Sequence, residues 1–168
     1  MNTPFAKNLS FLIVPAFLFS FAIKPDRANF SGSWSLNEGK SDLGQRAQFA
    51  TRTIKAEQKD DAITITKTSP GFNGGDDIVT TETLSFDGKE SESTVFGNSK
   101  KKSTLKWADD GQTFTINYTI AFERNGQTTE IKGTETWSLG DGSKTLNVVT
   151  ISSSPRGEST TKALYDKQ

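Results

Sequence analysis

Turn dipeptides recur at nearly constant spacing through the second half of the chain. Five pairs end in glycine: Asp87-Gly88, Asp110-Gly111, Asn125-Gly126, Asp141-Gly142 and Arg156-Gly157. The last four of these glycines are 15, 16 and 15 residues apart. Glycine readily adopts the positive φ angle that tight hairpin turns need. The spacing therefore predicts consecutive antiparallel strands of roughly 10–12 residues joined by short turns.

The segments between these turns alternate apolar and polar residues with the period of two that is typical of a β-strand. The clearest stripe covers residues 114–122, and shorter stripes cover 63–65, 84–86, 105–107 and 131–139. After residue 22 the best helical candidate is one turn within 41–48. Closing such a meander removes exposed strand edges. We predict an all-β fold, an antiparallel up-and-down β-barrel of about 8–10 strands, with a two-sheet sandwich as the alternative.

The first 22 residues differ from the rest of the chain, since they carry one charge, on Lys7, and five of the twelve phenylalanines. Their apolar run of 14 residues ends at Ala22 and is too short to cross a bilayer core of roughly 30 Å as a helix. This pattern is typical of a secretory signal peptide, cleaved after Ala22 or, less favourably, after Ala28. We expect a periplasmic or secreted protein without a membrane anchor. The predicted organisation is a signal peptide at 1–22, a linker at 23–29 and a single β-barrel domain at 30–168.

The chain contains no histidine and no cysteine, and its 20 basic and 20 acidic side chains balance. These absences exclude imidazole bases, thiolate nucleophiles, disulfides and thiolate zinc sites. The balanced charge gives no reason to expect nucleic-acid binding. The acidic doublets at 60–61, 76–77 and 109–110 lack the alternating ligands of a calcium loop. We therefore expect no metal and no cofactor.

The segment 29–36 reads Asn-Phe-Ser-Gly-Ser-Trp-Ser-Leu. Its Gly32 and Trp34 resemble the Gly-x-Trp opening of lipocalins and of intracellular fatty-acid-binding proteins, which share the calycin barrel. The ending 163–167 is similar to that of the fatty-acid-binding branch, and 86–90 and 136–146 resemble small secreted bacterial lipocalin-like proteins. In physical terms, Gly32 lets the chain pass close under the barrel floor and Trp34 plugs that end. The alternative is a core tryptophan beside a turn glycine.

The sequence also departs from these families. The fatty-acid-binding branch places a carboxylate-holding arginine two residues before the tyrosine, where this chain has Ala163. The helix pair that covers that barrel cannot fit in the 14 residues between Leu36 and Thr51. Lipocalins place an arginine against the tryptophan, a role that only Arg156 or Lys162 could fill here. Fatty-acid binding therefore does not carry over residue by residue.

Several polar residues occupy strand positions that are otherwise apolar. They are Arg52, Glu82, Tyr118 and Glu135. A charge inside a packed core costs several kcal/mol unless it is paired, so we expect these residues to line a ligand cavity; exposure at bulges or rims is the alternative. The loop 69–77 is the candidate mobile lip over the opening, through Gly71, Gly74 and Gly75. The basic run 100–102 is interpreted as a solvated strand edge.

We expect a monomeric lipocalin-like barrel that binds a small, mostly apolar ligand in its mouth and does not catalyse a reaction. One alternative is a barrel with a fully packed interior that has a structural or protein-interaction role. A third possibility is an enzyme that uses the carboxylates of Glu82 and Glu135 on a sugar. No histidine is present to activate a serine nucleophile.

Overall fold

The structure is a computed structural model that describes residues 26–95, 99–124, 126–155 and 157–168. The predicted signal peptide and the linker up to residue 25 lie outside the described residues, so both stay predictions. Within the described part of the chain, no helix is long and apolar enough to span a membrane.

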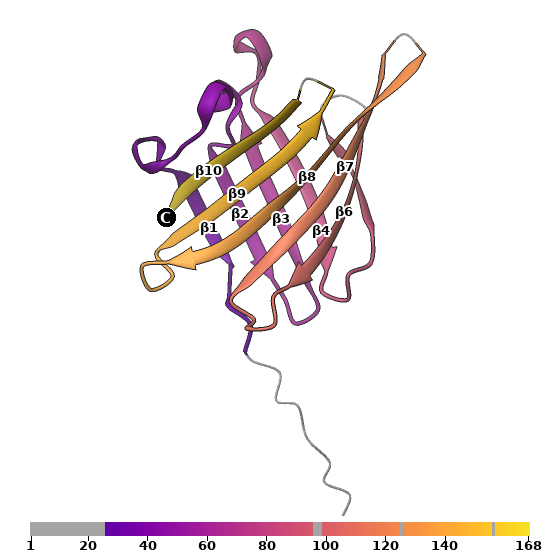
Figure 1. The fold of residues 1–168 in the computed structure, drawn as a ribbon. Coiled ribbons are helices and arrows are strands. Elements are labelled where there is room, and N and C mark those ends of the chain that lie inside the picture. Colours follow the sequence, from indigo (N-terminus) through magenta and orange to yellow (C-terminus); the bar gives the residue numbers. More distant parts are fainter. Residues whose placement is uncertain (1–25, 96–98, 125, 156) are drawn as a thin grey trace, which may run out of the picture.

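Ten antiparallel strands form one sheet that curls into a nearly closed up-and-down barrel (Figure 1). They are β1 (Gly32–Leu36), β2 (Thr53–Gln58), β3 (Ala62–Ser69), β4 (Ile78–Ser85), β5 (Ser91–Val95), β6 (Ser99–Trp107), β7 (Thr113–Arg124), β8 (Gln127–Gly140), β9 (Thr145–Ser154) and β10 (Gly157–Lys167). Neighbours in the sheet are consecutive in the chain except where β1 pairs with β10, and β4 and β5 are its two edges. The predicted barrel is confirmed, and the two-sheet alternative is wrong because every strand belongs to the same sheet.

The turns occur where the glycine dipeptides predict them. Gly88, Gly111, Gly126, Gly142 and Gly157 all have positive φ angles, between 63° and 106°. These angles let each hairpin reverse within a few residues. The turns after β2, β4, β6 and β8 lie at one end of the barrel, which we call the floor (Figure 1).

The opposite end, which we call the mouth, carries three short 3-10 helices: η1 (Glu38–Lys40), η2 (Gly44–Phe49) and η3 (Phe72–Gly74). η1 and η2 occupy the connection between β1 and β2, and η3 lies between β3 and β4. The predicted helical turn within 41–48 corresponds to η2. As expected from its length, the β1–β2 connection holds only these short turns and no helix pair.

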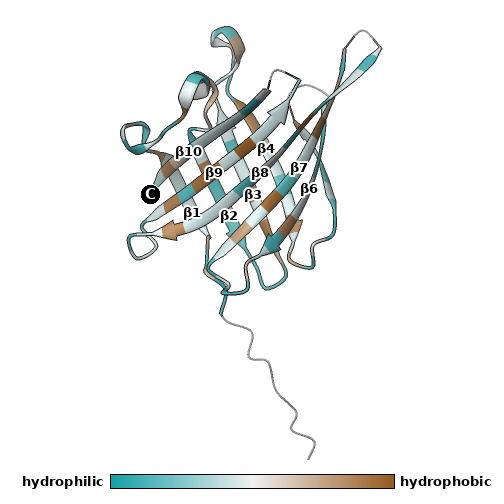
Figure 2. Ribbon diagram, in the orientation of Figure 1, coloured by the Kyte–Doolittle hydropathy of each residue, from teal (hydrophilic) through white to brown (hydrophobic). Residues whose placement is uncertain are grey.

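Apolar and polar residues are interspersed along the strands (Figure 2), and the burial pattern shows that the apolar stripe faces inward. Phe114 and Ile116 on β7 are fully buried, whereas Thr115 between them is not. On the outside, threonine hydroxyls bond across strands, as in the pairs Thr64–Thr83 and Thr66–Thr81 at 2.9 and 3.0 Å. The many threonines thus stabilise the solvated face of the sheet.

The floor half of the interior is a packed aromatic and aliphatic core. Phe114 stacks on Trp137 with ring centroids 5.3 Å apart, and Phe30 meets Phe114 edge-on at 4.7 Å. Over the whole interior, the fully buried apolar side chains are Phe30, Trp34, Ile54, Ile63, Ile65, Leu84, Leu105, Phe114, Ile116, Trp137 and Leu146. Aromatic pairs in such geometries add about 0.5–1.5 kcal/mol each beyond the area they bury.

The Gly-x-Trp segment belongs to this core. Trp34 is 1% exposed and its Nε1 donates to the Phe30 carbonyl oxygen at 3.2 Å. Gly32 has φ +147°, and a Cβ there would lie 3.1 Å from Cε of Lys167. That lysine places its Nζ 5.1 Å from the centroid of the Trp34 ring. The basic residue beside the tryptophan is therefore Lys167, its register partner on β10. The candidate Lys162 is wrong, because it lies five residues earlier on β10, opposite Val149. The other candidate, Arg156, lies outside the described residues.

Candidate functional site

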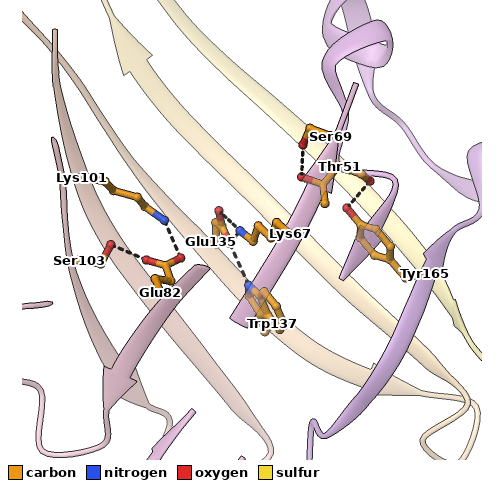
Figure 3. A network of polar contacts seen from close by, with 9 residues as sticks. All are labelled: Thr51, Lys67, Ser69, Glu82, Lys101, Ser103, Glu135, Trp137 and Tyr165. Atoms are coloured by element: carbon orange, nitrogen blue, oxygen red, sulfur yellow. Dashed lines mark hydrogen bonds and ion pairs between the residues drawn. The ribbon is translucent and has the colours of Figure 1, made fainter. Parts of the chain in front are cut away.

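Above the floor, a buried ion pair crosses the interior from β3 to β8. Lys67 Nζ donates to both carboxylate oxygens of Glu135, at 2.7 and 2.6 Å (Figure 3). Glu135 also accepts a hydrogen bond from Trp137 Nε1 at 3.1 Å. The ammonium of Lys67 lies 5.6 Å from the centroid of the Trp137 ring. The pair is thus fixed directly on top of the aromatic core.

A second ion pair joins β4 to β6 near the gap between the two edge strands, β4 and β5. Lys101 Nζ on β6 donates to Glu82 on β4 at 2.7 Å, and Ser103 Oγ donates to the other oxygen of the same carboxylate at 3.0 Å. Lys101 and Glu82 are each 7% exposed. Lys67, Glu82 and Lys101 surround one small cavity of about 20 Å³, enough for about one water molecule.

The two ion pairs together, Lys67–Glu135 and Lys101–Glu82, form a group with no net charge. Burial opposes ionisation of Glu135, but Lys67 and Lys101, together with the hydrogen bonds from Lys67 and Trp137, lower its pKa to about 2. Burial also opposes the charged form of Lys67, yet Glu135 and Glu82 raise its pKa above the usual value. Both members of the Lys67–Glu135 pair therefore stay charged at neutral pH.

Tyr165 continues the polar interior toward the mouth. Its hydroxyl donates to the Thr51 carbonyl oxygen at 3.1 Å, and Thr51 Oγ1 lies 3.1 Å from Ser69 Oγ. Burial, and secondly the charge on Glu135, raise the pKa of Tyr165 well above its usual range. The phenol is therefore neutral. Figure 3 shows the Lys67–Glu135 pair between this contact and the Lys101–Glu82 pair.

A cavity of about 270 Å³ lies inside the barrel beneath η2. Its apolar lining consists of Leu43, Phe49, Ala50, Ile54, Val148 and Ala163, and its polar lining of Thr51, Lys67, Glu135, Thr150, Thr161 and Tyr165. Thr150 and Thr161 are register partners on β9 and β10. The lining is thus half apolar and half polar, and its polar part includes the Lys67–Glu135 pair.

Two loops meet over the mouth. Phe49 of η2 and Phe72 of η3 have ring centroids 5.7 Å apart, and their side chains are half exposed. Gly71 permits the tight η3 loop, because a Cβ there would strike the carbonyl oxygens of Gly75 and Asp76. Gly74 has φ +77°. The three lip glycines therefore shape a compact turn at the mouth, while its mobility stays a prediction.

The four predicted cavity residues differ in where they lie. Glu82 and Glu135 lie in the interior, as their strand positions predict. Tyr118 is half-buried and covers Gly133 on β8, where an added Cβ would lie 2.5 Å from the phenol oxygen. Arg52 is exposed, so its predicted place in the interior is wrong: it precedes β2, at the mouth where the chain enters the barrel. Whether any of these four residues contacts a ligand stays a prediction.

Sequence reasoning missed the two lysines that neutralise the glutamates. Lys67 continues the inward stripe of Ile63 and Ile65, and Lys101 shares its side of β6 with Leu105. The same alternation that identified the glutamates could have found both lysines. Interpreting the run 100–102 as a solvated edge was wrong for Lys101, which is buried and paired.

The geometry of the carboxylates bears on the enzyme alternative. A glycosidase general acid needs a raised pKa so that it holds a proton near neutral pH. Glu135 has a pKa of about 2, and Glu82 is bound to Lys101 and Ser103. The arrangement suits two structural ion pairs better than an acid–base couple.

A larger but open hollow of about 670 Å³ crosses β6 to β9 on the other side of the sheet. Its charged rim is already paired, Lys102 with Glu90 at 2.9 Å and Lys132 with Glu130 at 3.3 Å. These side chains are more than half exposed, so each pair contributes little. The interior cavity is therefore the stronger candidate site.

No family model and no curated protein match the sequence. Two solved structures resemble the fold. A zebrafish ileal bile acid-binding protein, solved with cholic acid, has a TM-score of 0.50 and 18% identity over 83% of this chain and 98% of its own. A luciferase domain from the dinoflagellate Lingulodinium polyedrum has a TM-score of 0.51 and 8% identity over 85% of this chain and 43% of its own. Together with the ten-stranded barrel, these likenesses show a lipocalin-like, or calycin, fold.

Proposed function

We propose that this protein reversibly binds a small, mostly apolar ligand in the cavity beneath η2, without catalysing a reaction. The observation that carries the proposal is the 270 Å³ space among Ile54, Val148, Ala163 and the Lys67–Glu135 pair. A concave, mostly apolar site with a few convergent polar groups is the usual form of a small-molecule pocket. The bile acid-binding protein with a similar fold is consistent with this use of the barrel.

The size of the cavity limits the ligand. Ligand pockets commonly measure roughly 300–1,000 Å³, and this one is slightly smaller. A compact molecule of one or two rings fits the space better than a long chain. The polar lining residues would hold a polar group of the ligand, while the apolar ones would contact its hydrocarbon part.

A cavity-filling substitution tests the proposal. Thr161 on β10 lines the cavity, whereas the adjacent Thr160 is exposed on the opposite side of the strand. We expect Thr161→Phe to weaken binding of naphthalene probes, 2-naphthylmethanol or 2-naphthoate, by about tenfold or more because the phenyl ring occupies their space. Fluorescence titration measures the affinity, with circular dichroism as a check on folding.

Thr160→Phe is the matched control, with the same substitution one residue away on the outer face. This variant should bind 2-naphthylmethanol and 2-naphthoate with the same affinities as the unmodified protein. Binding of neither probe by the unmodified protein, or equal binding by the two variants, would contradict a site in this cavity. The barrel would then fit the packed structural alternative better.

The proposal extends to where the protein acts. We infer that residues 1–22 direct export and that the protein works as a monomer in the periplasm or outside the cell. N-terminal sequencing of protein from the exported fraction should begin at Ile23, and size-exclusion chromatography with light scattering should give the monomer mass. An intact N-terminus in that fraction would contradict cleavage.

A further inference from the structure

We infer that the ligand is electrically neutral at its polar end and carries a group, such as a hydroxyl or an amide, that both donates and accepts a hydrogen bond. This inference rests on the proposed function and concerns the chemical class of the ligand. It follows from the charges that line the cavity and from the way they are already satisfied.

Among the residues that the structure describes, the charged side chains in the cavity lining are Lys67 and Glu135. Lys67 donates to both carboxylate oxygens of Glu135, and its ammonium faces the ring of Trp137. The next charges in the interior, Lys101 and Glu82, also form a pair. The described residues of the cavity lining therefore carry no surplus charge of either sign.

A ligand carboxylate would disturb this balance. Its negative charge would have to compete with Glu135 for Lys67, and one of the two carboxylates would be left buried without a full partner. An ammonium group would compete with Lys67 for Glu135 in the same way. Uncompensated charges in a partly dry interior are strongly unfavourable. The preformed pair therefore disfavours ions in general.

A neutral polar group meets suitable partners instead. The hydroxyls of Thr150 and Thr161 can donate or accept, and they lie opposite each other in the register of β9 and β10. Two of the three donors of Lys67 reach Glu135, so one donor remains for a ligand oxygen. A hydroxyl can accept that bond while it donates to a threonine or to the carboxylate.

Two probes with one hydrocarbon skeleton test the inference. 2-Naphthylmethanol carries a hydroxyl and 2-naphthoate a carboxylate on the same ring system, so their hydrophobic contributions are similar. In fluorescence titrations at pH 7 and moderate salt, we expect the alcohol to bind about tenfold or more tightly than the carboxylate, because only the carboxylate adds a net charge.

Changing the charge of the cavity lining should change which of the two probes binds more tightly. Glu135→Gln keeps the shape and an acceptor for Trp137 Nε1, but leaves Lys67 with a surplus positive charge. We expect this variant to bind 2-naphthoate about tenfold more tightly than the unmodified protein, so that the ratio of the two affinities shifts toward the carboxylate. Glu130→Gln, on the same strand but more than half exposed, should change neither affinity.

The outcomes separate the ligand class from the proposed function. Tighter binding of 2-naphthoate than of the alcohol by the unmodified protein, abolished by Thr161→Phe, would overturn the neutral-ligand inference and keep the cavity. Equal affinities for the two probes would overturn it as well. Binding of neither probe would contradict the proposed function itself. The comparison in the unmodified protein decides the matter even if Glu135→Gln fails to fold.

Discussion

The floor and mouth halves of the barrel are built by the same strands but hold different side chains. Along the paired strands β7 and β8, the inward register partners change from Phe114 opposite Trp137 to Ile116 opposite Glu135 and then Tyr118 opposite Gly133. The first pair fills the floor with stacked rings, and the later positions bring in a charge and a glycine. One continuous alternation therefore produces a packed end and a polar, partly hollow end.

The difference between the two halves indicates which half stabilises the fold and which half provides the ligand site. The floor buries large apolar side chains, which is the main favourable contribution to folding. The mouth half holds ion pairs whose desolvation offsets much of their attraction. A site that must accept a ligand gives up some packing, so we expect the floor to stabilise the fold and the mouth half to provide the ligand site.

The largest expected effect comes from removing a floor ring. Phe114→Ala should destabilise the protein by about 3–5 kcal/mol, because it leaves a cavity in the fully buried aromatic core. Phe122→Ala, on the same inward stripe of β7 but half-buried near the mouth, should cost under about 2 kcal/mol. Urea denaturation measures both values. Equal decreases in the free energy of unfolding for the two variants would contradict the proposed difference between the halves.

The next effect concerns the buried ion pair. Lys67→Met leaves the Glu135 carboxylate without its partner and should destabilise the fold by about 2–4 kcal/mol. The double variant Lys67→Met with Glu135→Gln removes both charges and should recover most of that loss. If the double variant is as unstable as the single one, the lost lysine acts through packing and not through an uncompensated charge.

A smaller effect should appear in the pH dependence. The pKa of Glu135 is about 2 in the folded protein and ordinarily about 4.3 in an unfolded chain. A lowered folded pKa stabilises the fold above the unfolded value, and this contribution disappears as the pH falls from about 4.3 through about 2.

Glu135→Gln removes this titration. Its stability deficit relative to the unmodified protein should therefore shrink by up to about 3 kcal/mol between pH 6 and pH 2. Urea midpoints at several pH values measure the change, with Glu130→Gln as the exposed control. A deficit that is constant with pH would show that Glu135 does not have a lowered pKa.

Strand alternation and turn dipeptides were sufficient to predict the barrel and the inward position of Glu82 and Glu135. They failed for Arg52, because alternation says which side of a strand a residue faces and not where the strand begins. Alternation also places Lys67 and Lys101 on the inward side, but it does not say which glutamate each lysine meets. Pairing across a closed barrel depends on register and curvature, which no local pattern contains.

The cavity itself could not be predicted either. Its volume depends on how far η2 covers the mouth and on small residues such as Ala163 opposite Val148. Sequence composition left a fully packed barrel and a hollow one equally consistent with the aromatic content. The distinction became visible only when the large rings were found together at the floor.

The central claim is that a ligand occupies the mouth half and not the floor. Intermolecular nuclear Overhauser effects between 2-naphthylmethanol and assigned methyl groups test it most directly. We predict contacts from the naphthalene protons to the methyl groups of Val148 and Ala163, which line the cavity, and none to those of Leu84 and Leu105 in the floor core. Contacts to the floor leucines, or only to the exposed Val79 on the outside of β4, would contradict the claim.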